Sequence, residues 1–225
     1  MRIEVLAFAI GLSACTTSAP APAGPAGAQI AQFDARLQRG EALVAEIGAM
    51  YARDRLLREA IIAGFQDTPT AEARVAYIEG TRQHFDRVDG ENTRRMRQIF
   101  AEITWRELQD ISPNAAEQSF SLISHSSDVE FKKQMVVQFE PLAREGVLQG
   151  DRYANLVDDI AISEESPQVY GMNFECHHGV FQPRAVIDPA NLNARRAAIG
   201  LNSIEEYAAD SRALYGECPA DYSGN

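Results

Sequence analysis

The 225-residue chain is poor in cysteine, tryptophan and basic side chains. It has three cysteines, one tryptophan and 21 lysines and arginines against 32 acidic residues, for a net charge of −11. A chain this acidic repels the phosphates of nucleic acids, so DNA and RNA are excluded as partners. It also lacks the run of about 20 apolar residues that a membrane-spanning helix requires.

Motifs of common catalytic and cofactor sites are missing too. The sequence has no glycine-rich phosphate loop, no Cys-x-x-Cys, no His-Glu-x-x-His and no nucleophile elbow. Cys176-His177-His178 contains three potential metal ligands, but neighbouring residues of a strand point in opposite directions and rarely bind one ion. We therefore expect no metal and no cofactor, and whether the chain is an enzyme stays open.

The N-terminus resembles a bacterial lipoprotein signal. A short apolar run from Val5 to Ile10 leads to Leu12-Ser13-Ala14 and then Cys15, in the pattern of a lipobox. The resemblance implies cleavage before Cys15 and attachment of diacylglycerol and palmitate to it. It also implies an outer-membrane location facing the periplasm, because threonine follows the cysteine. The alternative is an ordinary signal peptide in which Cys15 is incidental.

The residues after Cys15 agree with an anchored protein. Residues 16–29 are rich in Thr, Ser, Ala, Pro and Gly, carry no charge and cannot bury enough apolar surface to fold, which is typical of a flexible tether. Cys176 and Cys218 are the remaining cysteines. In an oxidising envelope compartment they predict one disulfide, and two unpaired thiols are the alternative.

Most of the chain from Ile30 onward shows the three- and four-residue apolar spacing of amphipathic helices. Ser112-Pro113 is typical of a helix start, Ser127 or Asp128 can begin the next helix, and Ser203 to Glu206 forms a capping box. We expect a break at Asp89-Gly90 and a kink or break at Pro141. The predicted helices cover residues 30–62, 71–85, 91–103, 112–125, 128–142, 151–162, 188–200 and 203–215.

The apolar period changes after Ser166-Pro167. Alternating residues from Val169 to Phe181 flank Gly179 and predict a small hairpin with that glycine in its turn. The predicted fold class is therefore mainly α, a helical bundle with one small β-hairpin near the C-terminal third.

The stretch from Trp105 to about Tyr215 contains several distinctive pieces in a fixed order. They are Trp105, residues 123–128 (Ile-Ser-His-Ser-Ser-Asp), 156–158 (Leu-Val-Asp), 168–171 (Gln-Val-Tyr-Gly), and 191–201, which contain Arg195-Arg196 and end in Gly-Leu. Through these pieces the stretch resembles a bacterial domain family of unknown function, DUF6624. The chain departs from the family pattern at Asp159, where the family tends to have arginine, and at Met172-Asn173, where it tends to have Thr-Gln. The resemblance implies no reaction.

These interpretations divide the chain into five parts. They are a signal peptide (1–14), a flexible tether (15–29), an N-terminal helical region (30–104), a DUF6624-like helical domain with the hairpin (105–216) and a tail (217–225).

His125, Asp128 and Asp158 are the first candidate polar residues. A histidine near a carboxylate can act as a general base, and His125 with Asp158 from another helix could form a polar cluster. The plainer alternatives are an imidazole stabilised by the helix end for His125, and a solvated acidic face for Asp158 and Asp159.

Gln168, Tyr170, Arg195 and Arg196 form the second candidate group. Gln168 and Tyr170 would share one face of a strand, and a guanidinium nearby could bind a carboxylate or phosphate. The arginines could equally lock the hairpin onto the helix through hydrogen bonds.

The expected function is an envelope lipoprotein, bound to the membrane through its lipid, that binds a partner protein or a small polar ligand. The alternative is an envelope hydrolase. It would require His125, Asp158, Tyr170 and Arg195 to line one concave pocket.

Overall fold

The chain is described here from a computed structural model, which describes residues 24–177, 180–215 and 218. The predicted signal peptide, Cys15, the residues after it up to 23, and the tail apart from Cys218 lie outside the described residues. So do His178 and Gly179, the predicted turn of the hairpin.

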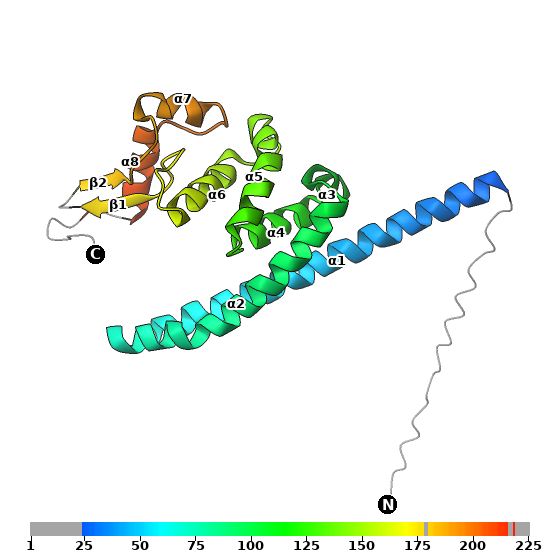
Figure 1. The fold of residues 1–225 in the computed structure, drawn as a ribbon, viewed down its shortest axis with the longest axis horizontal. Helices are drawn as coiled ribbons and strands as arrows, with labels where there is room; N and C mark the ends of the chain where they lie inside the picture. The colour runs from blue at the N-terminus through cyan, green and yellow to red at the C-terminus, as the bar shows by residue number, and fades with distance from the viewer. Residues whose placement is uncertain (1–23, 178–179, 216–217, 219–225) are drawn as a thin grey trace, which may run out of the picture. The chain divides into compact units, whose positions relative to one another are not determined.

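The architecture is helical with one antiparallel hairpin (Figure 1), as predicted. The elements are α1 (Pro25–Gln66), α2 (Ala71–Glu102), α3 (Trp105–Ile111), α4 (Pro113–Ser124), α5 (Val129–Arg144), α6 (Gly150–Ser163), β1 (Phe174–His177), β2 (Val180–Pro183), the 3₁₀ turn η1 (Pro189–Asn191), α7 (Leu192–Ala197) and α8 (Ile204–Tyr215).

The chain divides into two units, residues 1–42 and 43–225, with the boundary inside α1. The helix already begins at Pro25, within the segment predicted as a tether, because proline suits the first position of a helix. None of the described helices is long and apolar enough to cross a membrane.

The predicted break at Asp89-Gly90 is wrong, because α2 runs through both residues without interruption. Val88 and Met96 of α2 are buried, and Met96 belongs to the same core cluster as Ile47 of α1. Ion pairs link the two helices on both sides of the glycine, from Arg58 to Asp89 before it and from Arg53 to Glu91 after it. Packing between helices thus outweighs the cost of about 1 kcal/mol for a glycine in a helix.

The expected helix starts are confirmed. Ser112 accepts a hydrogen bond from the N–H of Ala115, with Pro113 at the first helical position of α4. Asp128 caps α5 through Phe131, and Ser203 forms the capping box with Glu206 at α8.

Pro141 does not end α5, which continues to Arg144. The proline removes a hydrogen bond to the carbonyl of Val137, a residue on the exposed side of the helix where water can replace the donor. The expected break is therefore absent at this position.

The core of the second unit is built around Trp105. Its ring meets Phe139 edge-on at 6.0 Å, and Phe139 in turn contacts Phe120 at 5.3 Å. The indole N–H donates to the carbonyl of Ala116 at 3.1 Å, so its one polar atom is satisfied inside the core. Trp105 thus ties α3 to α4 and α5.

The C-terminal part contains the hairpin, in which β1 and β2 pair from Phe174 opposite Pro183 to His177 opposite Val180. Cys176 on β1 is bonded to Cys218, with Cα atoms 5.6 Å apart, which confirms the predicted disulfide. Figure 1 shows α8 beside the hairpin and α5 beside α6.

Breaking this disulfide should destabilise the fold. The bond closes a sequence separation of 42 residues, and chain entropy assigns a loop of that length about 4 kcal/mol. We expect Cys176→Ser with Cys218→Ser to lower the free energy of unfolding by about 3–4 kcal/mol in urea denaturation. Labelling of the unfolded, unreduced wild-type chain should find neither thiol free. Two reactive thiols in that chain would contradict the pairing.

Candidate functional site

A buried carboxylate organises the loop between α6 and β1. Asp158 is 0% exposed, and its two oxygens accept hydrogen bonds from the N–H groups of Val169 at 2.7 Å, Tyr170 at 2.9 Å and Met172 at 2.8 Å. Burial raises the pKa of this carboxyl, although the three backbone donors act in the opposite direction. Asp158 is therefore neither on a solvated acidic face nor beside His125. It holds the loop in shape.

Gly171 allows the backbone to turn within this loop. Its φ is +69°, a conformation that residues with a side chain rarely adopt. A Cβ atom at this position would also come within 3.1 Å of the Ile204 side chain on α8. The Gln-Val-Tyr-Gly motif thus requires its glycine for its backbone conformation, and a side chain there would also press on Ile204.

The Gln168 side chain connects the start of this loop to its end at Asn173 and to the segment after β2. Its side-chain amide donates to the carbonyls of Asn173 and Arg184, and its side-chain oxygen accepts from the N–H of Asn173 at 2.7 Å. The expectation that Gln168 and Tyr170 share a strand is wrong, because β1 begins only at Phe174. Gln168 forms an isolated bridge with Val186 instead.

Arg196 is fully buried beneath the same loop. Its guanidinium donates to the carbonyls of Tyr170 at 2.6 Å and Asn202 at 2.8 Å and lies over the Tyr207 ring, 4.9 Å from its centre. Burial lowers the pKa of this guanidinium. Arg196 joins the loop to α7 and α8 and does not face solvent.

Arg195, the neighbour of Arg196 on α7, is bonded to the same loop but is only partly buried. It donates to the backbone carbonyls of Val169, Asp188 and Ile187. Its side chain is 24% exposed. These hydrogen bonds match the predicted alternative in which an arginine attaches the neighbouring segment to the helix. The remaining exposed edge borders a cleft.

This cleft lies between α5, α6 and α7 and has a volume of about 560 Å³, within the usual range of small-molecule sites. Its charged residues are Arg144, Arg195 and Glu140, so positive charge exceeds negative charge in an otherwise acidic chain. Its lining residues are Glu140, Arg144, Tyr153, Val157, Val169, Tyr170, Asn191, Ala194, Arg195 and Ala198.

Two tyrosines line this cleft. The rings of Tyr153 and Tyr170 meet edge-on, with their centres 5.8 Å apart. Burial raises the pKa of both phenols, so both remain protonated at neutral pH. Arg144 pairs with Glu140 on the same helix, through its Nη2 at 2.9 Å from Oε1. The cleft thus combines hydroxyl groups with guanidinium groups.

His125 lies elsewhere, at the end of α4, and its partner is Asp54 on α1. His125 Nδ1 is 2.7 Å from Oδ2 of Asp54, which is 1% exposed. Arg58 contacts the same carboxylate at 3.1 Å and reaches Asp89 on α2 at 2.8 Å. Burial acts to raise the pKa of Asp54, but the hydrogen bonds and charges of His125 and Arg58 outweigh it, so this pKa is lowered. Burial instead raises the pKa of Asp89.

The residues that follow His125 fasten the turn between α4 and α5. The buried hydroxyl of Ser126 is 2.7 Å from that of Thr93 on α2 and accepts the N–H of Asp128. Asp128 also forms an ion pair with Arg97, at 2.6 Å. This motif therefore joins the turn to α1 and α2.

The candidate residues fall into two groups. Asp158, Gln168, Tyr170, Arg195 and Arg196 meet around one loop, whereas His125 and Asp128 belong to the α4–α5 turn. Asp159, the neighbour of Asp158, is exposed and pairs with Lys132 at 2.6 Å.

Sequence reasoning missed Asp54, Arg58, Tyr153, Arg144 and Glu140. The i,i+4 spacing of Asp54 with Arg58 and of Glu140 with Arg144 signals local ion pairs. No spacing rule connects Asp54 with His125, 71 residues away.

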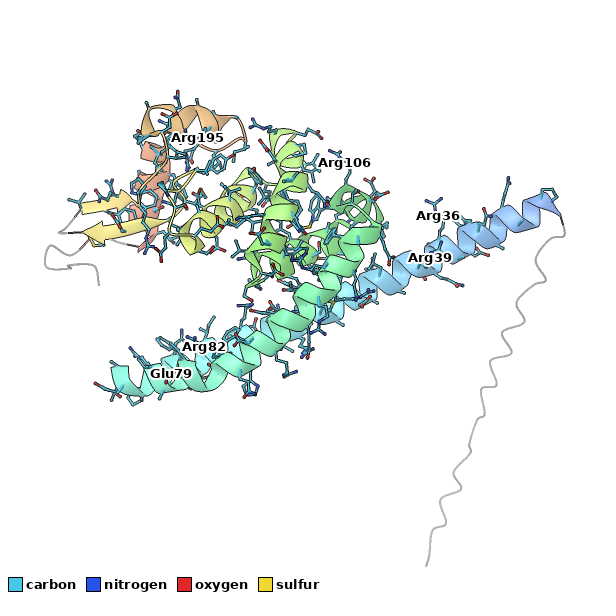
Figure 2. All side chains as sticks on the ribbon, in the orientation of Figure 1. Arg36, Arg39, Glu79, Arg82, Arg106 and Arg195 are labelled. Carbon is cyan, nitrogen blue, oxygen red and sulfur yellow. A yellow bond between two sulfur atoms is a disulfide. The ribbon has the colours of Figure 1, made fainter. Side chains whose placement is uncertain are left out.

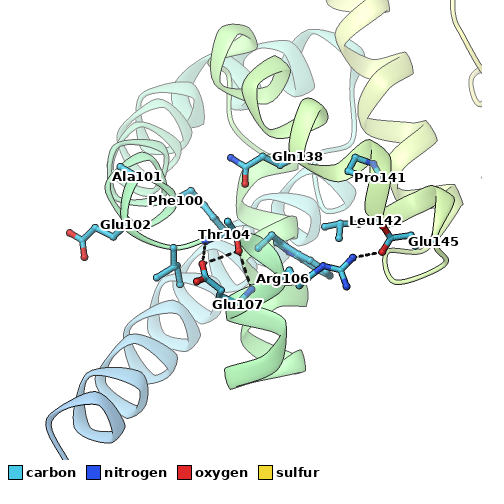
Figure 3. A pocket seen from close by; sticks show the side chains of 12 residues that line it. Phe100, Ala101, Glu102, Thr104, Arg106, Glu107, Gln138, Pro141, Leu142 and Glu145 are labelled. Atoms are coloured by element: carbon cyan, nitrogen blue, oxygen red, sulfur yellow. Dashed lines mark hydrogen bonds and ion pairs between the residues drawn. The ribbon is translucent and has the colours of Figure 1, made fainter. Parts of the chain in front are cut away.

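A second hollow of about 500 Å³ lies where the end of α2 meets α3 and α5 (Figure 3). Phe100, Trp105 and Leu142 contribute to its lining, and Arg106 pairs with Glu145 beside it. Among the described residues, Oε1 of Gln138 is buried there without a hydrogen-bond partner. This hollow is less suited to a charged ligand than the cleft that contains the two tyrosines.

Among the residues that the structure describes, no three histidines, cysteines or acids are grouped so that they could hold a metal ion. Cys176 is in the disulfide, so its thiolate is not available as a ligand.

Comparison with known proteins finds one family. A family model described as a family of unknown function, DUF6624, matches residues 41–217. The match begins well before Trp105 and so includes the second half of α1 and all of α2. No curated protein and no solved structure matches the chain.

The Asp54 pair gives a pH-dependent prediction. The pKa of Asp54 is below its ordinary value of 3.8 in the folded chain, so its charge stabilises the fold above that pH, and the contribution disappears on acidification through the lowered pKa. We expect Asp54→Asn to cost about 2 kcal/mol in urea denaturation at pH 7. The difference from wild type should shrink as the pH falls below 3.8.

Glu59→Gln is the matched control, because Glu59 pairs with Arg55 four residues away but is exposed. Exposed pairs contribute little, so this change should alter stability by less than about 0.5 kcal/mol. Equal losses for the two variants would contradict the role of Asp54.

Proposed function

The chain belongs to the DUF6624 family, and from its own geometry we propose that it is an envelope-anchored lipoprotein that binds a small anionic molecule. The binding site is the cleft between α5, α6 and α7. The observation that carries the proposal is the convergence of two arginines and two tyrosines on one concave surface.

The charges of the cleft favour a carboxylate-bearing ligand. Arg144 and Arg195 outnumber Glu140, and both arginines keep N–H groups beyond their protein contacts. A guanidinium binds a carboxylate through paired hydrogen bonds, and a protonated phenol adds a neutral donor. A ligand carboxylate could therefore take the place of Glu140 as the partner of Arg144.

Three residues of the family motifs do not line the cleft but hold the loop that contributes to its lining. Asp158, Gln168 and Arg196 are buried, and their polar atoms bind backbone groups of the loop. They are therefore positioning residues for Tyr170. The ligand contacts in this proposal come from Arg144, Tyr153, Tyr170 and Arg195.

Attachment to the membrane rests on Cys15 and its lipobox. The disulfide between Cys176 and Cys218 supports an oxidising compartment, because such bonds are rare in reducing ones. Multiple acyl chains on Cys15 would anchor the protein far more firmly than a single chain. We infer that the binding domain faces the periplasm from the outer membrane.

The alternative of a hydrolase requires His125 and Asp158 in one pocket with Tyr170 and Arg195. The lining of the cleft contains Tyr170 and Arg195 but not His125 or Asp158. His125 pairs instead with Asp54, and Asp158 binds backbone N–H groups. The geometry therefore favours binding over hydrolysis.

Ligand titration tests the cleft. We expect succinate and N-acetylglycine to bind in isothermal titration calorimetry, and the neutral N-acetylglycinamide to bind at least tenfold more weakly. Arg144→Gln should weaken succinate binding about tenfold or more, since a hydrogen bond to a charged group contributes about 1.5–3 kcal/mol.

Arg55→Gln is the control for this titration. Arg55 also pairs with an acid four residues away, Glu59, but lies on the exposed surface of α1. It should leave succinate binding unchanged. Equal affinities of wild type and Arg144→Gln for succinate would refute the site.

Growth with labelled palmitate tests the anchor separately. The wild-type chain should carry the label and sediment with membranes, and Cys15→Ala should lose both properties, because the cysteine thiol is the attachment point. An unlabelled wild-type product would refute the lipid anchor without affecting the ligand titration.

A further inference from the structure

A polar hollow of about 430 Å³ lies between α4, α6 and the loop that precedes β1, within the usual range of small-molecule sites. Arg195, labelled on α7 in Figure 2, belongs to the cleft of the proposed function, and no described residue lines both. On α6 the cleft is lined by Tyr153 and Val157, whereas the polar hollow is lined by positions 152, 155, 156 and 159, which share another face of the helix. Six of its eight lining residues are polar, namely Ser121, Ser124, Arg152, Asn155, Asp159 and Asn173.

The two charged residues of the polar hollow already have partners outside it. Nη1 of Arg152 is 2.6 Å from Oε2 of Glu117 on α4, and the guanidinium lies over the Phe120 ring, 5.7 Å from its centre. Oδ2 of Asp159 is 2.6 Å from Nζ of Lys132 on α5. An ionic ligand would have to displace one of these partners, so the hollow offers no uncompensated charge to an anion or a cation.

Neutral side chains supply the remaining hydrogen-bonding groups. Ser121 and Ser124 donate their hydroxyl protons to backbone carbonyls four residues earlier in α4, so each hydroxyl oxygen still has a lone pair for a ligand donor. Asn155 on α6 donates one N–H to the carbonyl of Asp151 at 2.8 Å and keeps its second N–H and its side-chain oxygen. The two helices thus present acceptors and donors to one space.

Asn173 has a fixed backbone and an unused side chain. Its backbone N–H and carbonyl are bonded to the Gln168 side chain at 2.7 Å and 3.0 Å, and the carbonyl also accepts from the N–H of Arg184. Within the described part of the chain its side-chain amide has no hydrogen-bond partner, and it is not among the polar groups that are buried away from solvent. An amide held in position in this way binds a ligand with little further loss of freedom.

We propose that the polar hollow binds a neutral saccharide. A sugar ring carries hydroxyls on adjacent carbons, and each hydroxyl both donates and accepts, which matches the serine oxygens and the two asparagine amides. An apolar ligand would find only Phe120 and Leu156, which are 5% and 3% exposed. The inference rests on neither the cleft nor the lipid anchor of the proposed function.

Titration with methyl glycosides tests the hollow on the full-length Cys15→Ala chain, which carries no lipid and needs no sugar-based detergent. The panel contains the methyl glycosides of glucose, galactose, mannose and N-acetylglucosamine. We expect at least one of them to shift the side-chain N–H₂ signals of Asn155 and Asn173 saturably in NMR spectra of a chain with isotope-labelled asparagine. The corresponding uronic acid and amino sugar should bind no more tightly, because Arg152 and Asp159 are already paired.

Alanine variants locate the bound sugar. Asn173→Ala should weaken binding about fivefold or more, the effect of losing one or two neutral hydrogen bonds. Asn155→Ala should also weaken it, and alanine suits this exposed helical position, so that variant keeps the fold. Asn114→Ala is the matched control, because Asn114 is an exposed asparagine of α4 outside the hollow. It should leave the affinity unchanged.

The outcomes separate the possible errors. The absence of saturable shifts with all four glycosides overturns the inference, and so does an affinity that both Asn173→Ala and Asn155→Ala leave equal to that of Asn114→Ala. A uronic acid or amino sugar that binds about tenfold more tightly than the neutral glycoside overturns it in favour of an ionic ligand. Succinate titration of Arg144→Gln still tests the cleft, because Arg144 does not line the polar hollow.

Discussion

The buried carboxylate of Asp158 determines how the C-terminal part of the domain is built. Its oxygens accept three backbone N–H groups from a loop that has no regular secondary structure. A loop next to a core would otherwise leave these donors without partners, at a cost comparable to several lost hydrogen bonds. One side chain on α6 thus provides the acceptors for three backbone N–H groups of an irregular segment.

The same loop presents groups in two directions. The carbonyl of Tyr170 faces the buried Arg196, and the carbonyl of Val169 faces Arg195 at the edge of the cleft. The Tyr170 ring meets Tyr153 from α6. The interactions that stabilise the loop and those that shape the cleft are therefore inseparable, and a change in Gln168 or Asp158 would act on the cleft through the backbone.

The polar residues that follow α4 hold the turn between α4 and α5 in place. The sequence marks His125 and Asp128 as candidate polar residues, and in the structure they and Ser126 connect the α4–α5 turn to α1 and α2. The reason is physical, because helix ends and turns need donors and acceptors for unpaired backbone groups. In the binding site that we propose, the ligand contacts come from partly exposed residues of the cleft, such as Arg144, which the motifs do not include.

Local signals in the sequence determined the helical fold, the capped starts at Ser112 and Ser203, the position of the hairpin and the pairing of the last two cysteines. These features depend on residues a few positions apart or, for the disulfide, on there being one available partner. Tertiary structure alone decided that α2 continues through Gly90, that Gln168 closes a loop outside any strand, and that His125 meets Asp54. Each of these depends on packing between segments distant in sequence, which periodicity and motif spacing do not encode.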